Sequence, residues 1–226
     1  MITPYYEEDG IKLYRGDCLE IMKEISDNSI DLVFTDPPYG IKHKNQEWDK
    51  CDWDKLMEFF IPESCRVLRE DRRLVMFIPK KRLYSLPPIF NNYLFDICIE
   101  LKNFANYRLH LGYIDSWQPI MIILKGKPYR HKKGGRNWFL VNSANTSKNE
   151  NNPRNFHPSG KGKDAMCHLI KWLSNKSDTI LDPFLGSGTT LVACKELGRQ
   201  GIGIEINKKY CDIAVKRIQN TQRNLL

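Results

Sequence analysis

The strongest constraint on the fold is a compact unit near the end of the chain. Its pattern is that of a strand, a turn, a helix and a second strand. Residues 179–181 (Thr-Ile-Leu) are strand-like, residues 189–197 have helical character and Gly198 follows them. Residues 201–205 (Gly-Ile-Gly-Ile-Glu) form a second short strand-like segment. A glycine just after the last helical residue is a common helix stop. A helix between two short apolar strands is typical of βαβ units, which predicts a parallel sheet.

Further apolar runs predict the rest of this sheet. Residues 30–35, 73–78 and 95–101 are continuous rather than alternating in apolar character, and a fourth run covers 119–125. Continuous runs are typical of strands that are buried on both faces. Helices are predicted over 53–68, interrupted or begun near Pro62, over 164–174 and from about 207 onward. The pattern therefore predicts one α/β domain over residues 1–226, with an open, mostly parallel sheet.

Composition excludes several classes of protein. The chain has 226 residues, of which 41% are hydrophobic and 27% are charged, a balance typical of globular domains. Its longest apolar runs, 74–79 and 119–124, fall far short of the roughly 20 residues of a membrane-spanning helix. The polar, acidic N-terminus is unlike a signal peptide. The seven cysteines never form a Cys-x-x-Cys pair, so we expect reduced thiols, a cytoplasmic protein and no metal site.

The positive charge is concentrated in one quarter of the chain. Residues 102–156 hold ten Lys and Arg against Asp115 and Glu150, which accounts for the whole net charge of +8. A neutral body with a basic appendage is expected of a protein that binds a polyanion, although a solvated basic surface is the alternative. The candidate phosphate contacts are Lys125, Lys127, Arg130, Lys132, Lys133 and Arg136.

The turn between the last two predicted strands has the layout of a nucleoside-binding unit. Gly186 and Gly188 permit a tight turn close to a ligand, and Glu205 ends the next strand, where it would accept hydrogen bonds from ribose hydroxyls. A phosphate-binding P-loop would need Lys after Gly188, where this chain has Thr. The alternative is a turn that serves packing only. The candidate binding residues are Asp182, Phe184, Leu185, Gly186, Ser187, Gly188, Thr189, Thr190 and Glu205.

A second motif, Asp36-Pro37-Pro38-Tyr39, directly follows the strand predicted over 30–35. At the carboxyl end of a strand in an open α/β sheet, such residues face the ligand crevice. The prolines remove two N–H donors and leave carbonyls that only accept. The carboxylate of Asp36 and the Pro37 carbonyl suit the amine of a planar base, on which Tyr39 would stack. A simple strand-terminating turn is the alternative.

Together the two motifs resemble those of the amino-group DNA methyltransferases, which transfer a methyl group from S-adenosylmethionine (AdoMet) to N6 of adenine or N4 of cytosine. The catalytic motif precedes the basic segment and the glycine motif comes last, which is similar to the order in the β class of that family. The resemblance implies a Rossmann-like AdoMet-dependent methyltransferase fold with circularly permuted motifs, and a small basic insertion at 102–156 for DNA recognition. Asp36 favours the N6-adenine members, because cytosine-N4 members more often carry Ser there.

The resemblance extends to weaker motifs. Asp17 and Cys18 are similar to a contact with the cofactor's adenine, and Asp36 itself borders the cofactor. Residues 157–161 resemble a His-Pro-Thr-Gln-Lys-Pro element near the methionine end, which implies cofactor contacts by His157 and Lys161; Ser159, Gly160 and Gly162 depart from that pattern. The implied partner is double-stranded DNA, with a homodimer and a cognate restriction endonuclease left open.

The implied mechanism is direct transfer to a flipped base. Asp36 and the Pro37 carbonyl would localise the lone pair of the amine, with no covalent intermediate and no metal. Alternatives are N4-cytosine methylation, methylation of RNA or of protein glutamine, and a catalytically silent AdoMet-sensing DNA-binding module. Two weaker groups complete the candidates. Trp48, Asp49 and Trp53 are predicted to form a lid, with a packing anchor as the alternative, and Lys80, Lys81 and Arg82 to contact phosphates, with a solvated loop as the alternative.

Overall fold

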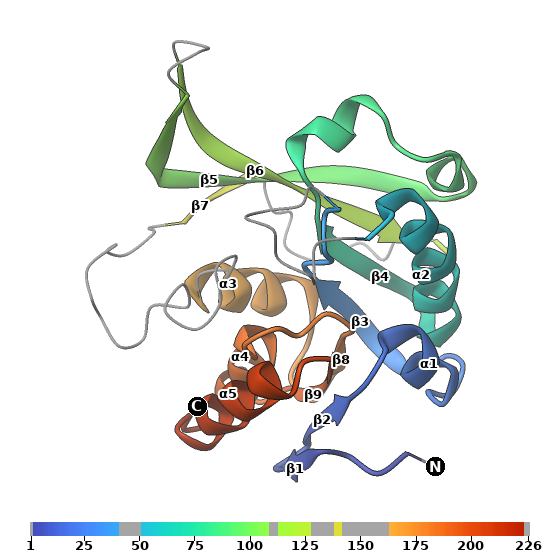
Figure 1. Ribbon diagram of the computed structural model, residues 1–226, viewed down its shortest axis with the longest axis vertical. Helices are drawn as coiled ribbons and strands as arrows, with labels where there is room; N and C mark the ends of the chain where they lie inside the picture. Colours follow the sequence, from blue (N-terminus) through green and yellow to red (C-terminus); the bar gives the residue numbers. More distant parts are fainter. Residues whose placement is uncertain (1, 41–50, 109–112, 128–137, 142–162, 224–226) are drawn as a thin grey trace.

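The computed structural model describes residues 2–40, 51–108, 113–127, 138–141 and 163–223. Within them, one sheet has the strand order β1-β2-β9-β8-β3-β4-β6-β5-β7 (Figure 1). The strands are β1 (Tyr6–Glu8), β2 (Ile11–Arg15), β3 (Ile30–Thr35), β4 (Leu68–Phe77), β5 (Leu94–Arg108), β6 (Tyr113–Leu124), β7 (Trp138–Val141), β8 (Thr179–Asp182) and β9 (Gln200–Glu205). The helices are α1 (Cys18–Lys23), α2 (Trp53–Val67), α3 (Lys163–Leu173), α4 (Thr189–Leu197) and α5 (Lys208–Gln219), with short 3-10 turns η3 (Lys80–Tyr84) and η4 (Pro88–Asn92).

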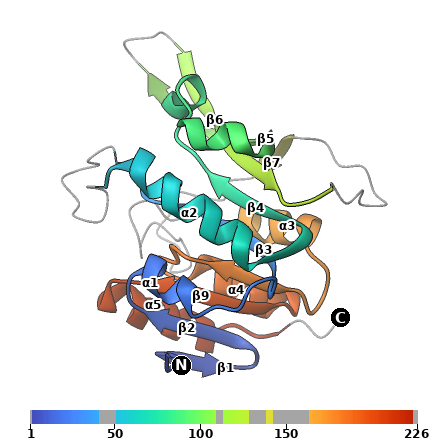
Figure 2. The same ribbon diagram turned by 90° about the vertical axis from the view of Figure 1, so that its right-hand side faces the viewer.

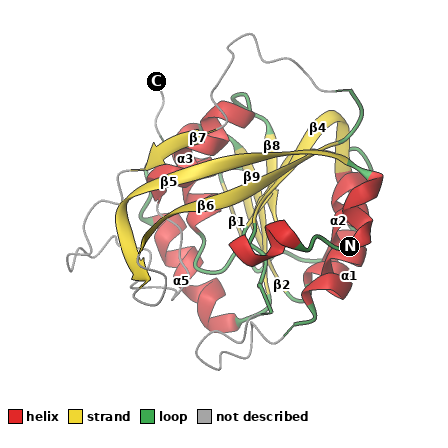
Figure 3. Cartoon of the chain, turned by 90° about the horizontal axis from the view of Figure 1, so that it is seen from above, coloured by secondary structure: helices red, strands yellow, loops and turns green. Residues whose placement is uncertain are grey.

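The centre of the sheet is parallel. Strands β2, β9, β8, β3 and β4 pair in parallel with one another, whereas β6 is antiparallel to both β4 and β5. Helices α1 and α2 cover one face and α3, α4 and α5 cover the other (Figures 2 and 3). The expected open, mostly parallel sheet with helices on both faces is confirmed.

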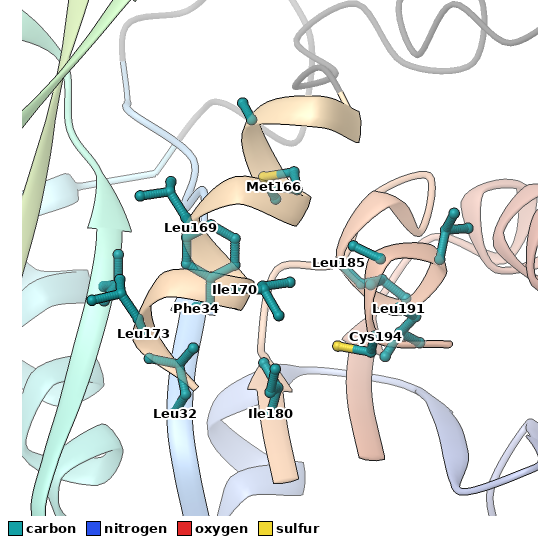
Figure 4. Packing of buried hydrophobic residues seen from close by; sticks show 14 of the residues in the cluster. Leu32, Phe34, Met166, Leu169, Ile170, Leu173, Ile180, Leu185, Leu191 and Cys194 are labelled. Carbon is teal, nitrogen blue, oxygen red and sulfur yellow. The ribbon is translucent and has the colours of Figure 1, made fainter. Parts of the chain in front are cut away.

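Strand β3 shows why continuous apolar runs are needed here. Successive side chains of a strand point to opposite faces. Leu32 and Phe34 therefore pack with the α3 side chains, among them Leu169 (Figure 4), while Val33 belongs to the core under α2. All six residues of β3 are buried. Burial on both faces fixes the strand whose end carries the Asp36 motif.

Helix α2 differs from the sequence expectation. The helix is continuous from Trp53 to Val67 with Pro62 inside it, rather than interrupted or begun at that proline. A proline within a helix removes one hydrogen bond and costs about 3 kcal/mol. The buried face of α2, which includes Met57, Phe60 and Ile61, offsets that cost through tertiary packing. Intrinsic propensity was therefore a poor guide at this position.

Two peripheral features were not predicted from the sequence. Strands β1 and β2 form an antiparallel hairpin, with Asp9 and Gly10 at positive φ in the turn. Strand β7 pairs in parallel with β5 at the other edge of the sheet. Strand β1 is short and mostly polar (Tyr-Glu-Glu), whereas β7 is apolar (Trp-Phe-Leu-Val) but only four residues long. Among the described residues, no helix is long and apolar enough to span a membrane.

Candidate active site

The predicted motifs meet at one edge of the sheet, where the parallel strands end. Asp17 lies two residues beyond β2, Asp36 follows β3, the glycine turn follows β8, and Glu205 ends β9. Two backbone hydrogen bonds fasten these ends together: Gly16 N–H donates to the Glu205 carbonyl at 3.1 Å, and Leu185 N–H to the Ile204 carbonyl at 3.0 Å. The carboxyl edge of such a sheet is where open α/β folds bind their ligands.

The glycine turn requires glycine at both positions. Gly186 and Gly188 have φ of 57° and 87°, which favour residues without a Cβ. A Cβ on Gly188 would lie 2.7 Å from the Cβ of Ala214 in α5. The tight turn expected from the sequence is therefore present, and part of its glycine requirement comes from packing against α5.

Glu205 faces this turn. Its Oε2 accepts from Gly186 N–H at 2.8 Å and its Oε1 accepts from Asn207 N–H at 2.7 Å. Burial raises the pKa of Glu205, and the backbone donors oppose that shift. A backbone contact from Ile206 acts in the same direction as those donors. A carboxylate has about four lone-pair sites, so Glu205 keeps capacity to accept from a ribose hydroxyl without losing the bonds that orient it.

Asp182 ends β8, directly before the glycine turn, and its side chain is enclosed by protein donors. Its side chain is only 3% exposed, and its Oδ1 accepts from the Thr35 hydroxyl at 2.6 Å and from Phe184 N–H at 3.1 Å. Its Oδ2 accepts from the Thr190 hydroxyl at 2.5 Å. Burial raises the pKa of Asp182 to about 6 despite these donors. The carboxylate therefore joins β3, β8 and α4 within the protein.

Other side chains of the turn are also committed to internal contacts. The Arg217 guanidinium donates to the Ser187 and Thr189 hydroxyl oxygens at 3.1 and 3.2 Å. Leu185 is buried in the core. Phe184 packs edge-on against Phe60, with ring centroids 5.2 Å apart. What the turn presents to a ligand is therefore chiefly backbone, together with Glu205.

Asp17 and Cys18 begin helix α1 beside Glu205. Asp17 is exposed and caps α1 by accepting from Leu19 N–H at 2.8 Å. Cys18 is buried, and desolvation raises the pKa of its thiol to about 12, with Asp17 and Glu205 adding to the shift. The thiol therefore stays neutral. Ile206, directly after Glu205, is 62% exposed and was missed from the sequence; its apolar surface suits a planar base.

The turn after β3 holds a hydrogen-bonded chain. The Tyr39 hydroxyl donates to Oδ1 of Asp36 at 2.6 Å, and Nε2 of Gln118 donates to the Tyr39 oxygen at 2.8 Å. Burial of the hydroxyl and the nearby Asp36 charge raise the pKa of Tyr39 well above its usual value. Sequence reasoning gave Tyr39 only a stacking ring and missed Gln118, although a polar residue beside the buried run 119–123 was a usable signal.

The two weaker groups of candidate residues make contacts within the protein. Trp53 is 1% exposed and stacks on Phe90 with centroids 6.1 Å apart, so it anchors α2 rather than forming a lid. Lys80 lies over the Trp117 ring at 4.1 Å, and Arg82 lies over Trp53 at 4.8 Å. Arg82 also pairs with Asp54 at 2.8 Å, and Lys81 is exposed. Trp48 and Asp49 lie outside the described residues.

The first two basic candidates lie away from this edge. The Lys125 ammonium donates to Asn28 Oδ1 at 2.7 Å and to the Leu68 carbonyl at 2.6 Å, both near the amino ends of β3 and β4. Lys127 N–H donates to Asp71 at 2.8 Å in the same region. Neither lysine joins the Asp36 motif. Several candidates lie outside the described residues: Arg130, Lys132, Lys133, Arg136, His157, Ser159, Gly160, Lys161 and Gly162.

A metal centre is not visible in the described part of the chain, where no cluster of three or more His, Cys, Asp or Glu side chains is placed to hold an ion. A shallow cleft lined by Gly10, Lys12, Thr179 and Gln200 lies at the amino ends of β2, β8 and β9. That is the opposite edge from Asp36 and Glu205. The chemistry-bearing residues are therefore concentrated at the carboxyl edge.

Comparison with known proteins gives consistent matches. The model of a family described as DNA methylase matches residues 30–216. The Type II methyltransferase M.BamHI of Bacillus amyloliquefaciens is 29% identical over 99% of this chain, which spans 60% of that relative's length. M2.LlaDCHI of Lactococcus lactis subsp. cremoris, also a Type II methyltransferase, is 28% identical over 96% of this chain and 93% of its own.

Solved structures agree with this match. The crystal structure of the M1.HpyAVI–SAM complex is 28% identical, with a TM-score of 0.72 over 92% of this chain and 99% of that one. The PvuII DNA methyltransferase, described as cytosine-N4-specific, also has a TM-score of 0.72, over 99% of this chain and 98% of its own. Its 16% identity establishes a likeness of fold alone.

Proposed function

The chain belongs to the DNA methylase family, and we propose that it transfers a methyl group from AdoMet to N6 of adenine in double-stranded DNA. The observation that carries the proposal is the meeting of the Asp36 carboxylate with the glycine turn and Glu205 at one edge of the sheet. This arrangement supplies an acceptor for an amine next to a nucleoside site. The coarser activity, AdoMet-dependent methylation of an amino group in DNA, is common to the family.

AdoMet fits the residues at this edge. The acceptor capacity left on Glu205 would serve the ribose hydroxyls, and the backbone of the glycine turn would border the methionine part. Ile206 offers apolar surface for the adenine ring, beside Asp17 at the start of α1. His157 and Lys161 are proposed as further contacts. Because Asp182 is enclosed by protein donors, its proposed role is to fix the turn rather than to touch the cofactor.

The proposed chemistry is a direct displacement. The amine nitrogen would attack the sulfonium methyl that bound AdoMet supplies, the carbon–sulfur bond would break to leave a neutral thioether, and one proton of the methylated nitrogen would pass to water. Asp36 and the Pro37 carbonyl would each accept one amine hydrogen, which turns the nitrogen lone pair toward the methyl group. Orientation and fixed electrostatics supply the acceleration. The target base must leave the duplex stack to reach Asp36, so base flipping is part of the proposal.

Adenine is preferred over cytosine because Asp stands at the first position of the catalytic motif. The competing N4-cytosine reaction would use the same displacement. A catalytically silent AdoMet sensor is disfavoured because Asp36 and Tyr39 are both present and hydrogen-bonded to each other. Methylation of RNA or of protein glutamine is disfavoured as well, because the basic segment offers no specific support for either substrate.

The test is a methyl-transfer assay with labelled AdoMet and duplex DNA of mixed sequence, followed by nucleoside analysis. N6-methyladenine is expected, and N4-methylcytosine would overturn the choice of base. Asp36→Ala should abolish turnover while AdoMet affinity stays near that of the wild type, because the main bonds of Asp36 form to the target amine. Asp164→Ala, an exposed carboxylate on α3, is the matched control. Near-normal kcat in Asp36→Ala would refute the mechanism.

For DNA binding we propose that residues 128–156 supply the phosphate-facing cations, in particular Arg130, Lys132, Lys133 and Arg136. The positive charge concentrated in this part of the sequence supports the proposal. Lys125 and Lys127 are left out of that surface, because their described contacts lie at the opposite edge of the sheet. Because M.BamHI is a Type II methyltransferase, we also propose a restriction–modification context for this chain, with a cognate restriction endonuclease as its partner.

A further inference from the structure

We propose that Gln118 is a positioning residue for the methyl-transfer reaction, acting on the catalytic carboxylate of Asp36 through the hydroxyl of Tyr39. The inference rests on the proposed function and adds to it a residue from another part of the chain. Gln118 is 79 positions from Tyr39 in the sequence, yet its amide lies 2.8 Å from the tyrosine oxygen. The tyrosine oxygen in turn lies 2.6 Å from Oδ1 of Asp36.

Simple chemistry fixes the direction of both hydrogen bonds. An ionised carboxylate only accepts, so the single hydroxyl proton of Tyr39 must point toward Asp36. The Tyr39 oxygen is then left with lone pairs on the side of Gln118. Only the amide nitrogen of Gln118 can meet those lone pairs, which fixes the orientation of the amide as well. The chain therefore runs in one direction, from Gln118 through Tyr39 to Asp36.

Gln118 lies on a rigid element. It belongs to β6, where it stands opposite Glu100 of β5. The next residue, Pro119, accepts a backbone hydrogen bond from Ile78 at 3.2 Å, and Ile120 and Met121 are fully buried. The turn that carries Asp36 and Tyr39 contains two prolines and directly follows the six-residue strand β3. The strand β6 therefore gives that turn an external support at a fixed position.

The support has a consequence for catalysis. The bond from Tyr39 engages Oδ1 of Asp36, the carboxylate that would accept from the target amine. It also fixes the plane of the carboxylate and the tilt of the tyrosine ring. Both the acceptor and the stacking surface of the flipped base are thus set by one amide on β6. Loss of the Gln118 donor should reduce kcat and leave the cofactor site unchanged.

The experiment is a double-mutant cycle on the full-length protein. Gln118→Met keeps the volume of the side chain and removes its donor, and Tyr39→Phe removes the hydroxyl through which Gln118 would act. We expect Gln118→Met to lower kcat about tenfold, equivalent to about 1.4 kcal/mol, with AdoMet affinity by calorimetry unchanged. In the Tyr39→Phe background the same substitution should change kcat by less than about twofold, because the connection is already broken.

The outcomes separate this inference from the proposed function. A wild-type protein that methylates no DNA would refute the proposed function. A methylating wild type in which the two substitutions act independently, or in which Gln118→Met leaves kcat unchanged, would overturn the role of Gln118 alone. Gln200→Met is the matched control, since that glutamine lies at the amino end of β9 and should leave kcat unaltered. If Gln118→Met fails to fold, Gln118→Leu replaces it, because leucine also lacks the donor and carries no charge.

Discussion

Gly188→Ala is the sharpest test of how the glycine turn is built. The position combines a backbone φ of 87° with a close approach to α5, where an added Cβ would lie 2.7 Å from the Ala214 Cβ and 3.0 Å from its Cα. Real Cβ atoms do not approach carbon atoms this closely, so α5 or the turn must move. Because the turn borders the proposed cofactor, the substitution should lower both stability and AdoMet affinity.

The two contributions can be estimated separately. Placing an L side chain in the left-handed region costs roughly 1–2 kcal/mol. Overpacking a tight contact costs typically about 1–3 kcal/mol. Gly188→Ala should therefore lower the free energy of unfolding by about 2–5 kcal/mol. Gly198→Ala provides the matched control: its φ is 71°, but among the described residues an added Cβ would meet no atom nearer than Arg223 Nε at 3.9 Å. Gly198→Ala should therefore lower the free energy of unfolding only by the backbone cost of roughly 1–2 kcal/mol.

Urea denaturation followed by tryptophan fluorescence measures both variants, and calorimetry measures AdoMet binding. A compensating substitution, Ala214→Gly, removes the atom that the new Cβ would strike. By itself it costs roughly 1 kcal/mol, because glycine weakens a helix. In the Gly188→Ala background it should instead recover stability, which gives a coupling of about 1–3 kcal/mol between the two sites. Equal losses for Gly188→Ala and Gly198→Ala, or simple additivity with Ala214→Gly, would refute the contact argument.

Two predictions concern ligand binding. Glu205→Ala should weaken AdoMet binding by about 1.5–3 kcal/mol, since the ribose hydroxyls lose a charged acceptor; an unaltered calorimetric Kd would contradict the assignment. Replacing Lys132, Lys133 and Arg136 together by Ala should weaken DNA binding on all sequences, and the plot of log affinity against log salt should flatten by about 0.9 for each phosphate that is no longer neutralised. Unchanged slope and affinity would show that the DNA path lies elsewhere, and AdoMet affinity should stay constant in this variant.

Local sequence signals predicted much of the fold. Strand β3 and helix α4 have the predicted bounds, because a continuous apolar run and a glycine stop are properties of neighbouring residues. The meeting of Asp36, the glycine turn and Glu205 followed from a general rule about parallel strands. The polar strand β1 carried no such signal, and the apolar run of β7 is only four residues long. The continuous helix through Pro62 depended on tertiary packing.

The side-chain roles within the site depended on contacts that a single sequence does not display. The Thr35 hydroxyl reaches Asp182 across 147 positions, and the Gln118 amide reaches Tyr39 across 79. Asp182 was therefore expected to touch the cofactor, whereas its carboxylate is satisfied by protein donors. Residue type and order along the chain predicted that Asp36, the glycine turn and Glu205 lie at one edge of the sheet, and the structure has them there. Which polar groups face the ligand, and which hold the framework, required the three-dimensional arrangement.

The buried Asp182 carboxylate leads to a prediction about stability and pH. Its pKa is about 6 in the folded protein, against an ordinary value of 3.8, and desolvation is the largest cause, with Asp36 adding repulsion. Between these two values the folded state retains a proton that the unfolded chain has lost. Stability from this group is therefore fully present below about pH 4 and decreases as the pH rises to about 6, by about 3 kcal/mol in total.

Asp182→Asn isolates that contribution, because asparagine has nearly the same shape and does not titrate. The free energies of unfolding of the wild type and the variant should be compared at several values between pH 4 and pH 7. Other carboxylates, such as Glu8 with its lowered pKa, act in the opposite direction, but they are shared by both proteins and cancel in the difference. The wild type should lose stability relative to Asp182→Asn as the pH rises through this window. A difference that is independent of pH would mean that the three donors around Asp182 fully compensate its burial, and that the carboxylate stays ionised throughout.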